Sequence, residues 1–167
     1  MVKNIVLIGF MGSGKTLLSK QLAKQLNRQR VSIDEAIEAK HGKTIADIFK
    51  TLGEAYFRAS EEAVVKEFAL SQGLIIDCGG GIVINPANIK ALKQNGVIFL
   101  LDVSAQTIYH RLKNDTTRPL LNVPDPQGAI KALLDQRLPL YQHAADFIVD
   151  ANDPSLEVPL VEILKKV

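Results

Sequence analysis

The sequence is poor in cysteine and histidine, the residues that most often cross-link small folds or bind transition metals. Cys78 is the only cysteine among 167 residues, which excludes an internal disulfide and a metal site built from cysteines. We interpret Cys78 as a small buried residue rather than a nucleophile. The histidines lack the spacing of metal ligands, so we expect surface positions for His41, His110 and His143.

Long apolar runs and a strong net charge are also missing. No run approaches the ~18 residues of a membrane span, and Lys15 and Lys20 interrupt the N-terminal apolar stretch, which argues against a signal peptide. The formal net charge of +2 is too small to indicate a general nucleic-acid or membrane surface. We therefore expect a cytoplasmic monomer that binds small molecules and neither nucleic acid nor membranes.

Short apolar runs alternate with longer helical patterns along the whole chain. Five runs are typical of buried strands, and the second is the weakest: 5–9, 30–34, 74–78, 97–103 and 146–150. Strands that are apolar almost throughout suit a parallel sheet covered on both faces. Repeated strand–helix units predict an α/β sandwich, and the length predicts one domain over residues 1–167.

Helix boundaries are marked by capping residues. Asn85 followed by Pro86 predicts a helix start, and Gly96 is expected to end that helix as its C-cap. Ser104 is an N-cap candidate, and "TIAD" at 44–47 resembles a capping box with Asp in place of Glu. These signals place helices between the predicted strands.

One segment breaks the alternation. Residues 113–128, "KNDTTRPLLNVPDPQG", contain three prolines together with Arg118. A long irregular loop in a compact domain is usually functional or mobile. The segment is either a lid or an ordinary surface excursion.

The stretch "GFMGSGKT" at 9–16 fits the phosphate-binding pattern G-x-x-x-x-G-K-[ST]. Glycines let phosphate oxygens approach inward-pointing backbone N–H groups, and the N-terminus of the following helix adds positive charge. Lys15 can reach the β- and γ-phosphates, and the Thr16 hydroxyl can bind Mg²⁺. The alternative is a glycine-rich turn between a strand and a helix. Because no N-K-x-D motif occurs and a motor needs a longer chain, a small-molecule kinase is favoured.

Three residues are candidates for binding the phosphate acceptor. Asp34 ends the second predicted strand, where its carboxylate can hold an acceptor hydroxyl and take its proton. The alternative is an N-cap or first-turn acid. Arg58 and Arg137 could form a fork for a carboxylate substrate. The alternative for Arg58 is an ion pair on a solvated face with Glu61 or Glu62.

A glycine triplet at 79–81 follows the third predicted strand. It can let a ligand lie against the backbone, or it can be a flexible turn. Asp77 stands just before it, where a Walker-B-type acid would end a strand. The alternative is an Asp bonded to nearby backbone.

Together these motifs resemble the shikimate kinase family over nearly the whole chain. The resemblance rests on "GFMGSGKT" at 9–16, "IDE" at 33–35, "GEAYFRASE" at 53–61, "CGGG" at 78–81, "RPLL" at 118–121 and "RLPLYQHAADFIVD" at 137–150. It implies the nucleoside-monophosphate-kinase fold, a three-layer sandwich with a five-stranded parallel sheet in order 2-3-1-4-5. It also implies transfer of the γ-phosphate of ATP to the 3-hydroxyl of shikimate, on the route to chorismate.

The resemblance implies a role for each acceptor candidate. Asp34 would hold the shikimate hydroxyls and act as the base, in a substrate-binding region at about 33–61. Arg58 and Arg137 would grip the carboxylate. The ring would lie near three glycines, Gly79, Gly80 and Gly81.

For the nucleotide, the resemblance implies a binding loop formed by Gly12, Ser13, Gly14, Lys15 and Thr16. Arg111 would stack near adenine. Arg118 would belong to a lid at about 113–125 and meet the transferring phosphate.

The chain departs from the family at the metal shell. The family usually has an Asp two residues before Asp34, and this chain has Ser32. We predict that Asp77 supplies the missing negative charge and that Asp77 and Thr16 hold Mg²⁺. The alternative is that Asp34 and bound waters complete the shell.

Two other functions remain open at this point. One is a kinase for another small polyol acid such as gluconate, on the same fold. The other is a regulatory module that binds ATP and catalyses nothing, which would need neither Asp34 nor a lid arginine.

Overall fold

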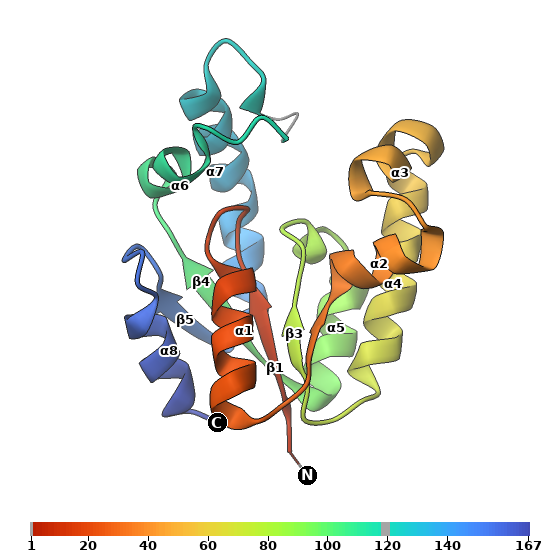
Figure 1. Cartoon of the computed structure of the whole chain (residues 1–167), viewed down its shortest axis with the longest axis vertical. Helices are drawn as coiled ribbons and strands as arrows, with labels where there is room; N and C mark the ends of the chain where they lie inside the picture. The colour runs from red at the N-terminus through yellow and green to blue at the C-terminus, as the bar shows by residue number, and fades with distance from the viewer. Residues whose placement is uncertain (1, 118–120) are drawn as a thin grey trace.

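The structure is a computed structural model that describes residues 2–117 and 121–167 of the chain (Figure 1). Five parallel strands form one sheet in the order β2-β3-β1-β4-β5. They are β1 (Asn4–Ile8), β2 (Arg30–Ser32), β3 (Ile75–Asp77), β4 (Gly96–Asp102) and β5 (Phe147–Asp150). The α/β class and the strand order predicted from the sequence are confirmed.

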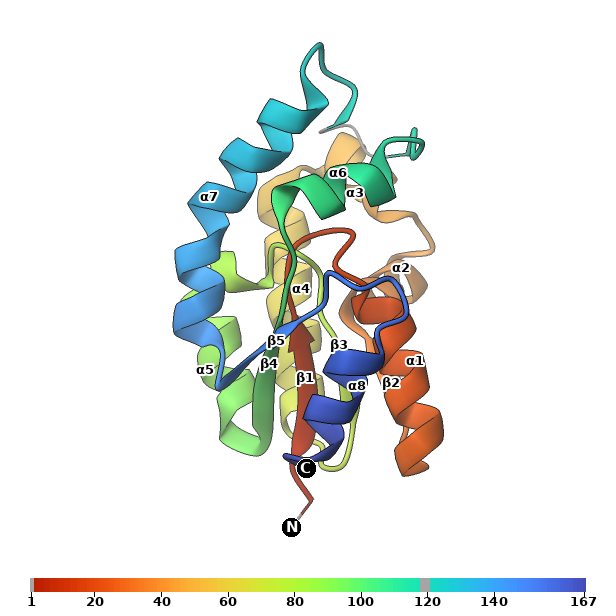
Figure 2. The ribbon, with the colours of Figure 1, turned by 90° about the vertical axis from the view of Figure 1, so that its left-hand side faces the viewer.

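Helices cover both faces of the sheet. They are α1 (Lys15–Leu26), α2 (Ile33–His41), α3 (Ile45–Leu52), α4 (Glu54–Ala69), α5 (Pro86–Asn95), α6 (Ala105–Leu112), α7 (Pro126–Ala144) and α8 (Glu157–Leu164), with a 3-10 turn η1 (Ile82–Ile84). Figure 2 shows α1 and α8 on one side of the sheet and α5 and α7 on the other. None of the described helices combines the length and apolar character needed to cross a membrane.

The strand β1 is the central strand of the sheet, and every one of its residues is buried. It pairs with β3 on one side and β4 on the other. The register places Leu7 of β1 beside Asp77 of β3, and Ser32 of β2 on the other side of Asp77. The carboxyl ends of the three strands therefore open onto the same edge of the sheet.

Most of the predicted caps are present. The Asn85 side chain accepts a hydrogen bond from the N–H of Ala87, with Pro86 at the first helical position. Ser104 and Thr44 cap α6 and α3 in the same way. These side chains satisfy backbone N–H groups that a helix start leaves unpaired.

Gly96 corrects one expectation. It follows α5, but its backbone is extended, with φ −125°, and it already belongs to β4. A Cβ at this position would lie 2.6 Å from the carbonyl oxygen of Leu92 and 2.9 Å from the Val6 side chain. Glycine is needed here for space between α5 and the sheet, and not for a left-handed cap.

The segment predicted as a lid lies between α6 and α7. In the structure the Asp125 side chain caps α7 by accepting from the Gly128 N–H at 3.0 Å. Residues 126–128 of the proline-rich stretch therefore form the first turn of α7. Arg118 lies outside the described residues, and lid motion stays a prediction.

Candidate active site

The residues predicted for the site gather at the carboxyl edge of the sheet. The phosphate-binding loop leads from β1 into α1, the glycine triplet follows β3, and α2 follows β2 (Figure 1). In open parallel sheets this edge is where ligands bind. The sequence motifs are thus brought together by the strand order.

The phosphate loop is supported from behind by apolar side chains. Gly12 and Gly14 have φ of 75° and 95°, values that side chains with a Cβ rarely adopt. A Cβ at Gly12 would meet Leu112 at 3.0 Å, and one at Gly14 would meet Leu156 at 2.9 Å. The loop therefore needs glycine at both positions, for conformation and for space.

Lys15 is buried and lies against the loop that it follows. Its Nζ donates to the carbonyl oxygens of Gly9 at 2.8 Å and Phe10 at 2.9 Å, and to the Ser13 hydroxyl at 3.3 Å. Thr16 is exposed in the first turn of α1. The buried ammonium of Lys15, the backbone N–H groups of the loop and the exposed Thr16 hydroxyl together suit phosphates and their metal.

Arg111 joins the phosphate loop to the segment after β5. Its guanidinium donates to the carbonyl oxygens of Gly12 at 3.1 Å, Ala151 at 2.8 Å and Asn152 at 3.0 Å. Burial lowers the pKa of this arginine, and Asp153 opposes that shift. Arg111 therefore contacts the phosphate loop, and its stacking on adenine stays a prediction.

The glycine triplet brings the acceptor candidates together. A Cβ on Gly79 would lie 2.9 Å from Oδ1 of Asp34, and one on Gly81 would lie 2.5 Å from the Arg58 guanidinium. A Cβ on Gly80 would lie 3.8 Å from Arg137. The space that the glycines leave is therefore occupied by the charged side chains of the site itself.

The sequence predicted that Asp34 ends the second strand, but the structure places it elsewhere. The strand β2 ends at Ser32, whose hydroxyl accepts from the Glu35 N–H at 3.3 Å and caps α2, so Asp34 lies in the first helical turn. Burial raises the pKa of the Asp34 carboxyl, Lys15 opposes this, and Asp77 adds to it. The carboxylate is thus electrostatically coupled to both the phosphate loop and the end of β3.

Arg58 is held by a buried glutamate, Glu61, that the alternative reading of the sequence placed on a solvated face. Glu61 is 1% exposed and pairs with the Arg58 guanidinium at 3.0 Å. Glu62 instead pairs with Lys66. Burial raises the pKa of Glu61, and Arg58 opposes that shift. The ion pair of that alternative is present, but its partner Glu61 is buried, and Arg58 also pairs with the exposed Glu54 at 3.4 Å.

Tyr141 is a second residue that the sequence analysis missed. It lies one turn after Arg137 on α7, is 1% exposed, and donates its hydroxyl hydrogen to the carbonyl oxygen of Gly80. Burial raises the pKa of Tyr141 to about 12. The phenol therefore stays protonated and ties α7 to the triplet. Its signals in the sequence are the four-residue spacing from Arg137 and its place in the stretch at 137–150.

Asp77, the predicted metal ligand, is 5% exposed and has a cationic partner in the structure. Arg30 donates to its Oδ2 at 2.7 Å. Within residues 2–117 and 121–167, no group of three or more His, Cys, Asp or Glu is arranged to hold a metal. Mg²⁺ in phosphoryl-transfer sites commonly takes only one or two carboxylates, with waters and phosphates.

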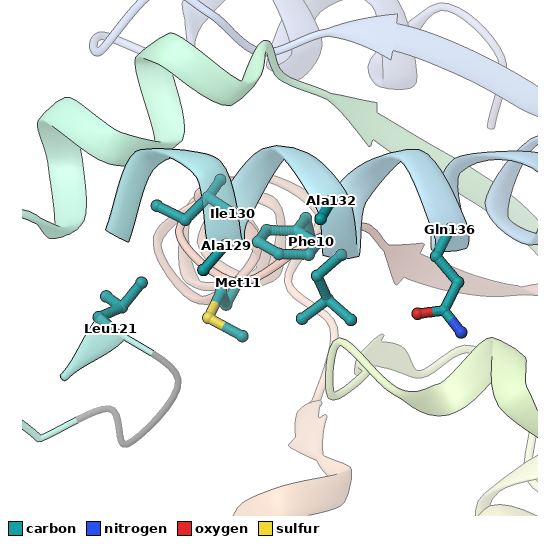
Figure 3. Close-up of a pocket in the computed structure, with 8 residues that line it drawn as sticks. Phe10, Met11, Leu121, Ala129, Ile130, Ala132 and Gln136 are labelled. Carbon is teal, nitrogen blue, oxygen red and sulfur yellow. The ribbon is translucent and has the colours of Figure 1, made fainter. Parts of the chain in front are cut away.

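An apolar hollow of about 250 Å³ opens beside the phosphate loop (Figure 3). Phe10 and Met11 of the loop face α7 across it, and Leu121 of the predicted lid segment also lines it. Gln136, next to Arg137, lies at its other end. The hollow gives the site an apolar wall on the α7 side.

A phosphate loop at the edge of a 2-3-1-4-5 parallel sheet, with acid and arginine side chains facing it, defines a small-molecule kinase of the nucleoside-monophosphate-kinase type. The chain belongs to the shikimate kinase family, whose model matches residues 11–167. It is accordingly an ATP-dependent kinase for shikimate.

Curated relatives and solved structures agree with this assignment. The chain is 45% identical to a shikimate kinase of Thermodesulfovibrio yellowstonii, over 99% of this chain and 95% of that one. It is 40% identical to one of Caldanaerobacter subterraneus, over 98% and 95%. The structure of an Acinetobacter baumannii shikimate kinase in complex with shikimate superposes with a TM-score of 0.93 at 34% identity, over 99% of this chain and 93% of that one.

A gluconokinase structure from Sinorhizobium meliloti is much more distant. It superposes with a TM-score of 0.57 at 15% identity, over 98% of this chain and 90% of that chain. Such a likeness shows a shared fold only. Shikimate is therefore favoured over gluconate as the acceptor.

Proposed function

We propose that the chain transfers the γ-phosphate of ATP to the 3-hydroxyl of shikimate, with Asp34 as the acceptor of the hydroxyl proton. The observation that carries the proposal is the convergence of Asp34, Arg58 and Arg137 on the glycine triplet beside the phosphate loop. As the shikimate hydroxyl oxygen forms its bond to phosphorus, the bond from phosphorus to ADP breaks. The hydroxyl proton passes to the Asp34 carboxylate. A raised carboxyl pKa suits a general base, whose efficiency is greatest when its pKa approaches the working pH.

The two arginines would bind the shikimate carboxylate. Arg58 lies against Gly81 and is anchored by Glu61, while Arg137 approaches Gly80 from α7. Guanidinium groups bind carboxylates through paired, charge-assisted hydrogen bonds. With the carboxylate held at this end, the ring would lie along residues 79–81 with its hydroxyls toward Asp34.

The nucleotide would occupy the other end of the site. Backbone N–H groups from Gly12, Ser13 and Gly14 and the Lys15 ammonium would bind the phosphates, and Arg111 would lie near the base. Arg118, which lies outside the described residues, is proposed to bring positive charge to the γ-phosphate. Together these groups would neutralise the charge that moves onto the leaving phosphate oxygens.

The site also suits Mg²⁺. Burial and the nearby Asp77 carboxylate both raise the pKa of Asp34, which indicates negative charge that a divalent ion would relieve. We assign the Thr16 hydroxyl and Asp77 to the ion, with Asp34 and waters as the alternative set. When bound, Mg²⁺ would neutralise phosphate charge during transfer.

We propose that the enzyme works as a monomer on small molecules. ATP is the co-substrate, and this need for ATP supports a cytoplasmic location. No residue of the proposed site requires nucleic acid or a membrane surface.

Release of ADP, measured with shikimate, with gluconate and with no acceptor, tests the proposal. Release only with shikimate is expected, and Arg58→Ala and Arg137→Ala should each raise the shikimate KM about ten- to a hundredfold, because each removes a charge-assisted hydrogen bond. The ATP KM should change little. Release with gluconate, or equal release without any acceptor, would contradict the proposed reaction.

A further inference from the structure

Arg30 is a partly buried cation that the proposed reaction does not use. Its side chain is 13% exposed, and its guanidinium donates to Oδ2 of Asp77 at 2.7 Å, where Asp77 is itself 6% exposed. The same guanidinium pairs with the exposed Glu35 at 3.0–3.1 Å. Burial alone would lower the pKa of Arg30, but its two acidic partners outweigh this and raise it. Arg30 is therefore a permanent positive charge next to the proposed metal site.

The strand register explains why the cation stands there. Ser32 of β2 and Asp77 of β3 are direct neighbours, and Leu7, which leads toward the phosphate loop, lies on the other side of Asp77. Ser32 carries no charge, and its hydroxyl is committed to capping α2. The carboxylate at this edge is therefore Asp77 of β3. The cation that balances it is Arg30, two residues before Ser32 on β2.

A hydroxyl relay also links Arg30 to the phosphate loop. Its Nε donates to Ser19 Oγ at 2.8 Å, and Ser19 in turn donates to the backbone carbonyl of Thr16 at 2.9 Å. A serine hydroxyl has one hydrogen to donate, so the 3.5 Å approach of Ser19 to Asp77 is the weaker contact. Arg30 therefore contacts one proposed metal ligand directly and reaches the backbone of the other through Ser19.

We propose that Arg30 is an internal counter-cation that sets how tightly the site holds Mg²⁺. It binds one oxygen of Asp77 and leaves the other without a hydrogen bond among the described residues. A fixed positive charge beside the carboxylate weakens the attraction for a second cation. The metal consequently binds well only when the nucleotide adds its own negative charge. This inference rests on the metal assignment in the proposed function.

Mn²⁺ titration of the nucleotide-free chain, with free Mn²⁺ measured by electron paramagnetic resonance, tests the inference. Arg30→Gln should lower the Mn²⁺ Kd by roughly tenfold or more, because one repelling charge is lost. Arg30→Lys, which keeps the charge, should remain near the parent. Arg28→Gln is the matched control, because Arg28 contacts only the backbone carbonyls of Lys3, Gly73 and Leu74 in the described chain.

Several results would overturn the inference. They are an unchanged Kd in Arg30→Gln, no detectable Mn²⁺ binding by either the parent or Arg30→Gln, and an equal gain in Arg28→Gln or Arg30→Lys. If Arg30→Gln does not fold, the double variant Arg30→Gln/Asp77→Asn is compared with Asp77→Asn, because the double variant removes both members of the ion pair and leaves neither charge of that pair without its partner. The double variant should then bind Mn²⁺ more tightly, and equal binding rejects the inference.

The titration is independent of the kinase assay. If the parent phosphorylates shikimate but the Mn²⁺ Kd is the same in the parent and in Arg30→Gln, the proposed function stands and this inference fails. If Mn²⁺ affinity depends on Arg30 but shikimate is not phosphorylated, the proposed function fails and the role of Arg30 in cation binding stands.

Discussion

The phosphate end of the site takes its donors from the eight consecutive residues 9–16, whereas the acceptor end takes its charged groups from α2, α4 and α7. At the phosphate end, Lys15 donates to carbonyl oxygens of its own loop. At the acceptor end, Arg58 depends on Glu61, and Gly80 depends on Tyr141 from another helix. The residues of the phosphate end can be recognised as one unit in the sequence, whereas the acceptor end fails when any one of its distant segments shifts.

The largest effect is expected when Asp34, the carboxylate between the phosphate end and the acceptor end, is replaced. Asp34→Asn should lower kcat by about 10²–10⁴, the usual range for a positioned general base. The amide keeps the shape but cannot take the proton, so the shikimate KM should change less than kcat. An unchanged kcat at saturating substrates would reject Asp34 as the base.

Lys15→Met should damage the phosphate end alone. Loss of a preorganised positive charge at the transferring phosphate should lower kcat by about 10²–10³. Binding of shikimate without nucleotide, measured by calorimetry, should be retained because the acceptor groups are anchored elsewhere. A variant that lost shikimate binding as completely as turnover would show that the two ends are not separable.

Alanine substitutions at two adjacent glycines distinguish displacement of Arg58 from a general effect of added bulk at the acceptor end. Gly81→Ala places a Cβ 2.5 Å from the Arg58 guanidinium and should displace it, raising the shikimate KM about tenfold. Gly80→Ala is the matched control, because the nearest atom to its Cβ would be 3.5 Å away, an ordinary contact. The ATP KM should stay near the parent value in both. Equal effects of the two substitutions would contradict the geometry.

The smallest expected effect is a pH dependence of stability. Burial raises the pKa of Glu61, so the folded state holds its proton more tightly than the unfolded state. The stability of the parent relative to Glu61→Gln should therefore fall as pH rises from the ordinary value of 4.5 through the raised value. One proton limits the slope to about 1.4 kcal/mol per pH unit.

Urea unfolding of both chains across this range measures the difference. Glu62→Gln is the control of opposite sign, because hydrogen bonds from Lys66 and Asn85 lower the pKa of the exposed Glu62. Its contribution should be present at neutral pH and be lost as pH falls. A difference for Glu61→Gln that does not vary with pH would contradict the assignment.

The sequence predicted the sheet well because buried parallel strands are apolar almost throughout. It placed the end of the second strand two residues too late, since Val31 and Ile33 alternate like a strand. Ile33 in fact belongs with Ile37, four residues later, on the buried face of α2, and both are fully buried. Ser32 begins the helix by capping it.

The candidate site was predictable to the extent that it is local. The phosphate loop is one motif, so its residues could be assigned directly. Glu61 and Tyr141 could not be assigned, because their roles depend on burial against a segment distant in sequence. Arg30 was missed for the same reason, since its partner Asp77 lies 47 residues away.

Leu156 has a consequence for the order in which the protein is made. It holds a left-handed backbone conformation, with φ 56°, and packs against Gly14. The carbonyl groups that Arg111 contacts, at 151 and 152, belong to the same late segment. During synthesis the phosphate motif is therefore complete early. Leu156, which packs against it, follows some 140 residues later. A growing chain carries the ATP-binding residues through most of its synthesis without the packing that shapes them, so we expect nucleotide to stabilise the fold only after this late segment has been made.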